Sequence, residues 1–241
     1  YKRVIGNSNI VITRGERVIK EINNFFHRVI NCVYVPNLYL FDNKKVENIE
    51  NKKKIILYCG SFSKSKRVDI LIEGLYYLKK NLQLTNYTVK LFGDGELKQE
   101  IIKKSFEYGL ANLEFNSYIN EIEKEIINSD VAIKTSENEG QPMFLVESLA
   151  YGIPVIMPNI SNIPDLAIHN YNALLVEPLD VEGFADAIYR LMTDEVLYKK
   201  LKAGAQNFRK EHEYEFSMEN ITNIWNDIFK QLGLIEETNA K

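Results

Sequence analysis

Short apolar runs alternate with amphipathic stretches along most of this chain from residue 55 onward. Runs rich in β-branched and aromatic residues predict strands at residues 55–59, 87–92, 113–115, 131–134, 155–157 and 173–176. Apolar residues at three- and four-residue spacing predict helices at residues 68–82, 95–108, 119–128, from 142, and at 181–193. This alternation predicts an α/β fold whose core is a Rossmann-like, doubly wound parallel sheet. Such sheets bind ligands in the crevice beyond the carboxyl ends of their strands.

The two ends of the chain follow other patterns. Residues 9–13 predict a short strand followed by a helix, and residues 33–37 predict a strand closed by a Pro-Asn turn. Residues 42–54 favour a solvated linker over a basic patch, because no aromatic residues interleave with the lysines. Residues 216–232 predict a strongly amphipathic last helix, whose apolar stripe is more often core than a partner surface. Residues 235–241 are typical of a frayed tail.

Composition and charge exclude several classes of protein. With 45% hydrophobic and 26% charged residues among 241, the chain has the makeup of a soluble globular protein of one large or two small domains. Its net charge of −3 gives no global attraction to nucleic acid or to an anionic membrane. No apolar run approaches the roughly 20 residues of a membrane-spanning helix, and no signal peptide pattern occurs. Cys32 and Cys59 lack metal-ligand spacing and are predicted to be reduced, buried thiols of a cytoplasmic protein.

Residues 136–155 say most about function. They predict the end of a strand, a polar turn, a helix that begins at Gly140 and Pro142, and a turn into the next strand. Proline suits the first turn of a helix, whose free N–H groups and dipole attract an anion such as phosphate. Glu139 and Glu147 bracket this start, and eight residues of continuous helix rise by about 12 Å. A glycosidase pair sits roughly 5 to 9.5 Å apart, so the two acceptors instead suit an elongated ligand such as a nucleotide sugar.

The same segment reads Glu-Gly-x-Pro-x-x-x-x-Glu-x-x-Ala-x-Gly-x-Pro-Val. It resembles the Glu-x7-Glu signature of retaining GT-B glycosyltransferases, family 4 in particular, and mainly of their C-terminal, donor-binding domain. Glu139 and Glu147 match the two glutamates, and the tail of the signature is matched by Ala150, Gly152, Pro154 and Val155. The alternative is an ordinary βαβ unit with surface glutamates, but so many residue types at fixed offsets are hard to obtain by chance. The resemblance covers about residues 55–200 well and the two ends loosely.

The loop after the first core strand carries a second match. Residues 60–67, Gly-Ser-Phe-Ser-Lys-Ser-Lys-Arg, resemble the family's Gly-Arg-x-x-x-x-Lys-Gly loop, in which the arginine and the lysine hold the donor diphosphate. Lys66 falls on the lysine position, and Ser61 stands where the arginine is usual. Three explanations stay open: Arg67 or Lys64 supplies the missing positive charge, the helix dipoles contribute more to diphosphate binding, or diphosphate binding is weak. The alternative for Lys66 is a solvated lysine in a charged loop.

Two weaker motifs follow later strands. Residues 93–95, Gly-Asp-Gly, match the family's Gly-x-Gly beside the nucleobase and are equally typical of a tight turn. Residues 115–119 resemble the family's Phe-x-Gly-x-Val loop, with Ser117 in the place of its glycine and Tyr118 as a candidate for stacking on the base. In a chain with 14 tyrosines, core or surface packing explains Tyr118 at least as well.

The resemblance implies a metal-independent transferase that moves a sugar from a UDP- or GDP-linked donor with retention of configuration. It gives catalytic roles to Glu139, which contacts the transferred sugar, to Glu147, which binds the ribose hydroxyls, and to Lys66, which helps to stabilise the leaving diphosphate. The donor-binding residues that it implies are Gly60, Ser61, Lys66, Arg67, Gly93, Gly95, Ser117, Tyr118, Glu139, Gly140, Gln141, Pro142, Met143, Phe144, Leu145 and Glu147. No cofactor is expected, and the scattered histidines indicate no metal site.

The resemblance also divides the chain into regions. Residues 1–41 correspond to the end of an N-terminal acceptor domain and the hinge, 42–54 to a linker, 55–213 to the nucleotide-sugar-binding domain, and 214–241 to a C-terminal crossing helix and tail. If this resemblance of the N-terminal end holds, we expect most of the first domain to be absent, and the opening tyrosine in place of methionine suggests a fragment. A sugar, glycan or lipid-linked acceptor would bind on that domain or on a partner chain. Trp225 of the last helix could face the same partner.

Other functions stay open at this point. The chain could be a nucleotide-sugar-binding half without activity of its own, which donor binding without transfer would indicate. It could also be a GT-B sugar epimerase, which would release free sugar or the epimer without any acceptor. A nucleic-acid protein is remote, because the chain lacks the positive charge. Peripheral association of the intact enzyme with a membrane is compatible with the resemblance.

Overall fold

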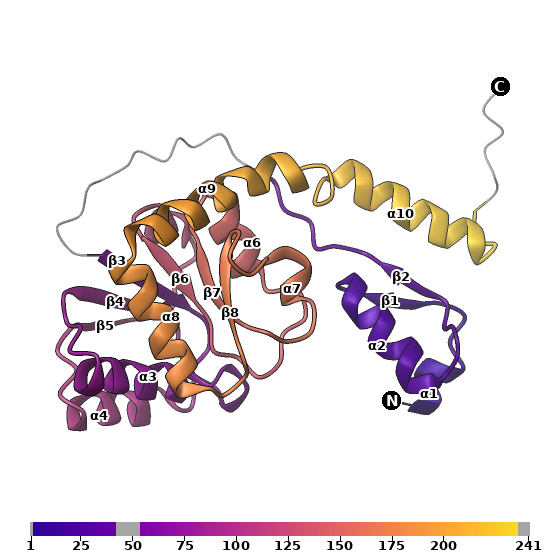
Figure 1. Cartoon of the computed structure of the whole chain (residues 1–241). Coiled ribbons are helices and arrows are strands. Elements are labelled where there is room, and N and C mark those ends of the chain that lie inside the picture. The colour runs from indigo at the N-terminus through magenta and orange to yellow at the C-terminus, as the bar shows by residue number, and fades with distance from the viewer. Residues whose placement is uncertain (1, 42–53, 236–241) are drawn as a thin grey trace.

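The structure of the chain is a computed structural model that describes residues 2–41 and 54–235. The predicted linker at residues 42–54 lies outside the described residues except for Lys54, as does the predicted tail from residue 236. Figure 1 shows a layered α/β body, a smaller N-terminal part beside it, and a last helix that leads away from the body.

Within these ranges, six parallel strands form one sheet in the order β5-β4-β3-β6-β7-β8 (Figure 1). The strands are β3 (Lys54–Cys59), β4 (Tyr87–Phe92), β5 (Leu113–Asn116), β6 (Val131–Ile133), β7 (Val155–Pro158) and β8 (Ala173–Val176). The strand order reverses between β3 and β6, so the crevice beyond these two strands is the switch point at which doubly wound sheets bind ligands. The predicted Rossmann-like parallel sheet is confirmed.

Helices cover both faces of this sheet. They are α3 (Val68–Asn81), α4 (Lys98–Glu107), α5 (Glu123–Ile127), α6 (Met143–Ala150), α7 (Ile163–Leu166), α8 (Val181–Thr193) and α9 (Glu195–His212). One face packs against α3, α4, α8 and the first half of α9, through residues such as Leu71 and Phe184. The other packs against α5, α6, α7 and the second half of α9, through residues such as Leu145 and Phe208. Burial on both faces explains why the strands are continuous apolar runs.

The sequence pattern missed α9, the long helix that follows α8. Lysines, glutamates and glutamine interrupt its apolar residues, and its buried side holds Tyr198, Leu201, Gly204, Ala205 and Phe208. Its start does carry a local signal, because the Asp194 carboxylate accepts a hydrogen bond from the Leu197 N–H at 2.9 Å. The helices predicted at residues 95–108 and 119–128 exist, but α4 and α5 begin later, at Lys98 and Glu123.

The N-terminal part holds the strand, helix and strand that the sequence predicts. A short helix α1 (Lys2–Gly6) precedes β1 (Val11–Thr13), α2 (Glu16–Phe26) and β2 (Cys32–Tyr34), and the two strands pair in parallel. No residue of α2 is buried. Polar contacts join this part to the body, among them the Arg17 Nη1 hydrogen bond to Asn159 Oδ1 at 3.1 Å.

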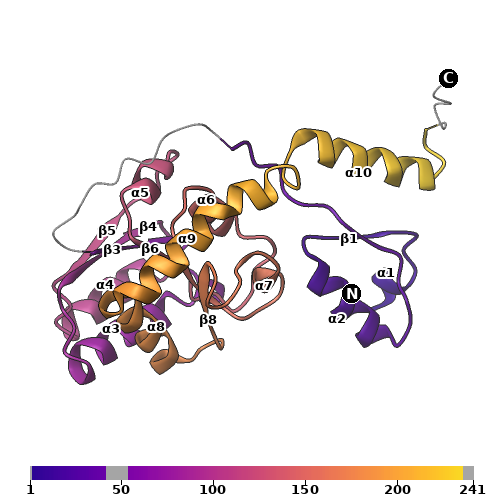
Figure 2. The same cartoon turned by 45° about the horizontal axis from the view of Figure 1, so that its top comes forward.

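The last helix, α10 (Met218–Gln231), contributes little to the core, contrary to the expectation for its apolar stripe. Ile228 is its only buried residue, and Trp225 is half-buried. Figure 2 shows α9 lying across the body and α10 continuing beyond it, on the side of the N-terminal part. The helix is amphipathic as predicted, but the described part of the chain supplies no helix or sheet layer that covers its apolar stripe.

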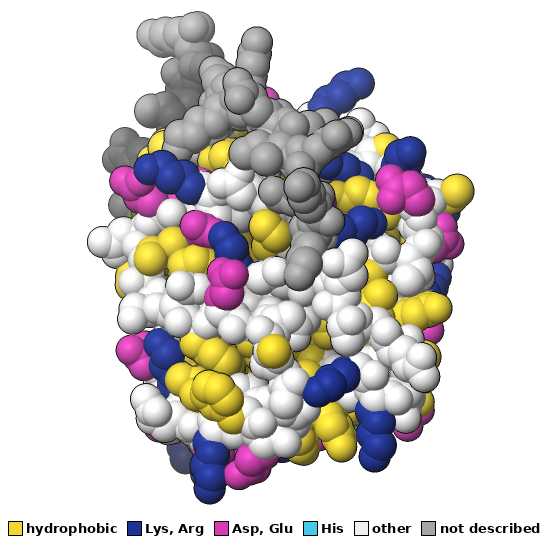
Figure 3. All heavy atoms as spheres, turned by 90° about the vertical axis from the view of Figure 1, so that its left-hand side faces the viewer, with side chains coloured by type: hydrophobic (Ala, Val, Ile, Leu, Met, Phe, Trp, Pro, Cys, Tyr) yellow, Lys and Arg dark blue, Asp and Glu magenta, His cyan; other side chains and the backbone are white. Residues whose placement is uncertain are grey.

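Four expectations about chemistry can be compared with the described residues. Cys32 and Cys59 are both free, but each is only half-buried, so the prediction of buried thiols was wrong. The described residues contain no cluster of histidine, cysteine and carboxylate side chains that could hold a metal, and none of their helices is long and apolar enough to cross a membrane. On the face shown in Figure 3, basic and acidic side chains are interspersed rather than gathered into one basic surface.

Candidate functional site

Two loops meet beyond the carboxyl ends of the central strands. We call residues 60–67, which follow β3, the Gly60 loop, and residues 134–142, which follow β6, the Glu139 loop. The Glu137 N–H donates to the Ser65 carbonyl at 3.0 Å, and the Thr135 hydroxyl donates to the Arg67 carbonyl at 2.7 Å. These bonds hold the two loops together at the switch point.

Lys66 and Glu139 form the ion pair at the centre of this junction. Lys66 Nζ lies 2.8 Å from Glu139 Oε1, which also accepts a hydrogen bond from the Ser136 hydroxyl at 2.7 Å. The Glu139 side chain is 8% exposed and that of Lys66 is 25% exposed. Breaking a pair with so little solvent would leave a buried charge uncompensated. The pair therefore fixes both side chains in position at the loop junction.

Arg67 does not supply the cation that Ser61 fails to provide. Its guanidinium donates to both carboxylate oxygens of Asp69 and to Glu137. The hydrogen bonds that Arg67 donates to Asp69 are the leading cause that raises the pKa of Arg67, ahead of the bond to Glu137. Lys64, the other candidate for this role, is exposed. Arg67 thus fastens the Gly60 loop to its surroundings, which corrects its expected role as a donor ligand.

The start of α6 offers unclaimed backbone donors. Pro142 caps the helix without a side-chain hydrogen bond, and the first N–H that bonds back to its carbonyl is that of Leu145, at 3.0 Å. The N–H groups of Met143 and Phe144 have no acceptor among the residues the structure describes. A Cβ on Gly140 would meet nothing within 4 Å, so open space lies before the helix. This arrangement suits an anion.

Two residues near the start of α6 that were predicted to bind the sugar donor make other contacts in the structure. The Gln141 side-chain carbonyl accepts the Asn37 N–H at 2.6 Å, and its amide donates to the Tyr34 hydroxyl at 3.0 Å. Leu145 is fully buried and its N–H is already bonded. The structure therefore corrects the assignment of Leu145, while the backbone of Gln141 stays a predicted donor ligand. The Gln141 side chain holds the N-terminal part, and Leu145 belongs to the core.

Glu147 stands on the first turns of α6 with a half-buried carboxylate that has no hydrogen bond or ion pair among the described residues. Burial raises its pKa, the charge of Glu123 raises it further, and the charge of Lys134 lowers it. Lys134 is the residue that sequence reasoning missed, because it reads as the last residue of a strand. It is 5% exposed and lies beside Tyr58 and Phe144, with ring centroids 5.3 and 5.6 Å from its Nζ.

Both glycines of the Gly-Asp-Gly motif are needed for close backbone packing. Gly93 and Gly95 have φ values of 148° and 152°, which favour glycine. A Cβ on Gly93 would lie 1.9 Å from the Gly60 carbonyl oxygen, and one on Gly95 would lie 2.6 Å from the Phe62 carbonyl oxygen. The turn therefore packs directly on the Gly60 loop, which accounts for the glycines whether or not a base binds there. Ser117 and Tyr118 are exposed, and the Tyr118 side chain is 71% exposed.

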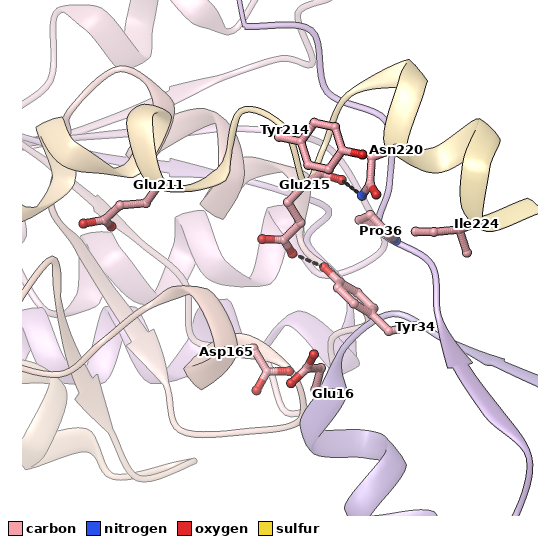
Figure 4. A pocket seen from close by; sticks show the side chains of 9 residues that line it. All are labelled: Glu16, Tyr34, Pro36, Asp165, Glu211, Tyr214, Glu215, Asn220 and Ile224. Carbon is pink, nitrogen blue, oxygen red and sulfur yellow. Dashed lines mark hydrogen bonds between the residues drawn. The ribbon is translucent and has the colours of Figure 1, made fainter.

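A separate cavity of ≈480 Å³ lies between the N-terminal part and the body (Figure 4). It is lined by Glu16, Tyr34, Pro36, Asp165, Glu211, Tyr214, Glu215, Asn220 and Ile224. Figure 4 shows the Tyr34 hydroxyl directed at Glu215, and the bond between them is 2.5 Å long. Several carboxylates line this cavity, so it is unsuited to a diphosphate. It contains none of the predicted donor ligands.

Known proteins with similar sequences include several glycosyltransferases. Residues 41–208 match the family described as glycosyl transferases group 1. An uncharacterized glycosyltransferase of Methanocaldococcus jannaschii is 26% identical over 231 residues, which cover 95% of this chain and 62% of that protein. The poly(ribitol-phosphate) alpha-N-acetylglucosaminyltransferase of Staphylococcus aureus is 25% identical over 239 residues, or 95% of this chain and 46% of that protein. The chain thus spans about half the length of these relatives.

Solved structures agree on the fold. A variant of S. aureus TarM in complex with fondaparinux, alpha-GlcNAc-glycerol and UDP superposes with a TM-score of 0.81 at 25% identity, over 93% of this chain and 44% of that one. Sucrose-phosphate synthase from Thermosynechococcus elongatus has a TM-score of 0.79 at 21% identity, over 96% of this chain and 60% of that one. The doubly wound sheet and the loops at its switch point define an α/β protein of the GT-B glycosyltransferase class. Within that class, the chain belongs to the glycosyl transferases group 1 family.

Proposed function

We infer that this chain binds the donor of a nucleotide-sugar-dependent glycosyltransferase of the retaining, metal-independent family 4 type. One observation carries the proposal: the Lys66–Glu139 pair lies where the loops after β3 and β6 meet, and the adjoining helix start has unclaimed N–H groups. Cations and free N–H groups at a switch point suit a diphosphate. The UDP in the S. aureus TarM complex supports a UDP-linked donor.

Each proposed role follows from what the group can donate or accept. Lys66 and the N–H groups of Met143 and Phe144 stabilise the negative charge that builds on the leaving diphosphate. Glu147, whose carboxylate lacks a partner among described residues, accepts hydrogen bonds from the ribose hydroxyls. Glu139 positions Lys66 and contacts the transferred sugar. In a retaining reaction of this type, the leaving phosphate oxygen takes the acceptor's proton, so no side chain is assigned as a general base.

The acceptor and the cellular location also belong to this proposal. A sugar, glycan or lipid-linked acceptor would approach from the side of the N-terminal part, which polar contacts such as Asn37–Gln141 join to the donor side. The similarity to an alpha-N-acetylglucosaminyltransferase that acts on poly(ribitol-phosphate) supports a glycan-type acceptor. We place the enzyme in the cytoplasm, with the intact protein able to associate peripherally with a membrane.

A thermal-shift panel of UDP-, GDP- and ADP-sugars tests the donor assignment. A true ligand raises the melting point by mass action, and ligand at 100 times its Kd stabilises a protein by about 2.7 kcal/mol. We expect a UDP-sugar to raise the melting point equally with and without a metal chelator. The response should weaken in Lys66→Ala and Glu147→Ala and persist in Lys64→Ala, an exposed lysine of the same loop. A full response in both site variants would overturn the site assignment.

A further inference from the structure

Lys134 is a buried cation that no described carboxylate neutralises directly. Its side chain extends from the end of β6, and the residue is 5% exposed. Its Nζ makes neither a hydrogen bond nor an ion pair with any residue in the described ranges. The Nζ atom lies over the aromatic rings of Tyr58 and Phe144. Burying an ammonium with so little compensation is costly, so a residue kept only for packing would be apolar, like Ile133 before it.

The ammonium lies between the two phosphate-binding features of the site. A Cβ on Gly60 would be 2.6 Å from Lys134 Nζ, so the glycine that opens the Gly60 loop leaves the space that this ammonium occupies. Phe144, on the other side, belongs to the first turn of α6, where free N–H groups begin. Lys134 therefore faces the gap between that loop and that helix start, at the switch point between β3 and β6.

The charges around Lys134 are those of the proposed donor site. Burial is the largest influence and lowers its pKa, Glu139 and Glu147 favour its charged form, and Lys66 opposes it. Cys59 is a further titratable neighbour. Two lysines thus converge on a place where an incoming dianion would receive charge-assisted hydrogen bonds.

We propose that Lys134 binds the donor diphosphate and supplies the second cation that is missing at Ser61. This role rests on the proposed function. The Lys134 ammonium donates to a non-bridging phosphate oxygen, together with Lys66 and the N–H groups of Met143 and Phe144. The positive charge thus comes from the end of β6 rather than from the second residue of the Gly60 loop. Lys134 is a binding residue of the same site, and its charge is favourable only when the diphosphate is present.

Calorimetric titration of the full 241-residue chain tests this role, with UDP as the probe, GDP and ADP in parallel, and uridine as the phosphate-free comparison. Lys134→Met should raise the Kd of UDP at least about tenfold, leave uridine binding unchanged, and raise the melting point of the ligand-free protein. Lys134→Gln is the second neutral variant, should the methionine variant fail to give the parent's circular dichroism spectrum. Ser61→Arg in the Lys134→Met background should restore UDP affinity, because it returns a cation beside Gly60.

Lys54→Met is the matched control. Lys54 also lies over a tyrosine ring, with Nζ 4.1 Å from the Tyr198 centroid, but at the opposite end of β3. Its loss should leave UDP affinity unchanged. If the parent binds UDP and both neutral Lys134 variants bind it equally well, Lys134 has no part in the donor site, while the site itself stands. If the parent binds none of the three diphosphates, the proposed function fails and the role of Lys134 fails with it.

Discussion

At the scale of residues, the site is built from charged groups that the ligand-free protein does not fully neutralise. Lys134 has a lowered pKa and Glu147 a raised pKa, in both cases mainly because burial disfavours the charged form. Groups perturbed in this way cluster at functional sites, because a ligand can supply the missing partner. The fully paired Arg67, in contrast, contributes to loop structure.

Glu147→Gln should stabilise the ligand-free protein at neutral pH. The folded-state pKa of Glu147 is raised, so the stability that its neutral form provides is present below the unfolded value near 4.5 and is lost as pH rises through the folded value. The amide stays neutral at every pH. The variant should be more stable than the parent at pH 7 and equally stable at a pH below the pKa of the unfolded carboxyl. Urea unfolding across this range measures the difference, and a gain independent of pH would contradict the explanation.

At the scale of elements, close backbone contacts decide where helices and loops can sit. The Gly-Asp-Gly turn packs against the Gly60 loop, and the Phe62 N–H donates to the Asp94 carbonyl at 2.9 Å. Elsewhere in the body, α9 approaches the loop before β8 so closely that a Cβ on Gly204 would lie 2.1 Å from the Tyr171 carbonyl oxygen. Both contacts require glycine, and the requirement cannot be read from the local sequence because the contacting atoms belong to another segment.

Gly204→Ala should destabilise the protein although it replaces glycine by the best helix former. Alanine favours an exposed helix by about 1 kcal/mol over glycine, but here it forces α9 away from a backbone carbonyl, which costs about 1 to 3 kcal/mol as overpacking does. Gly74→Ala in α3 is the matched control, because its nearest backbone atom, the Val181 oxygen, is 3.4 Å away. Thermal unfolding should rank Gly204→Ala below Gly74→Ala, and the reverse order would refute the contact.

At the scale of the whole molecule, a polar network links the N-terminal part to the Glu139 loop of the candidate site. Tyr34 donates to Glu215 at 2.5 Å and accepts from Gln141 at 3.0 Å, while Asn37 bonds to Gln141. Burial favours a high pKa for Glu215, but hydrogen bonds from His212 and Tyr34 outweigh it and lower that pKa. The network thus joins β2, the Glu139 loop and the segment after α9.

Tyr34→Phe should loosen the N-terminal part while leaving the body intact. The change removes one donor from the Glu215 carboxylate, at a cost of about 1 to 3 kcal/mol. Because the pKa of Glu215 is depressed, this contribution is present above the unfolded value of about 4.5 and is lost as pH falls through the folded value. Amide hydrogen exchange in β1 and β2 should quicken at pH 7. Tyr214→Phe, whose side chain lines the same cavity but is 60% exposed, should not change it. If amide exchange in β1 and β2 is as slow in Tyr34→Phe as in Tyr214→Phe, the Tyr34 hydroxyl does not hold the N-terminal part.

The sheet was predictable because it depends on local pattern, and the candidate site was placed by the same pattern. Apolar runs of strand length gave all six core strands, and parallel strands place their following loops at one edge. α9 was missed because polar residues interrupt its apolar ones. The last helix was expected to be core because its stripe is amphipathic, but amphipathicity says nothing of whether a covering layer is present.

The sequence by itself determined the α/β class, and it predicted the strand edge that carries the candidate site and the Lys66 and Glu139 positions. Their physical basis is residue periodicity and the spacing of groups along one segment. Only the tertiary structure decided which cation is free. Asp69 and Glu137 neutralise Arg67, while Lys134 points between the Gly60 loop and α6 without a carboxylate at bonding distance among described residues. Charge pairing depends on contacts between distant segments, and such contacts exist only once the chain has folded.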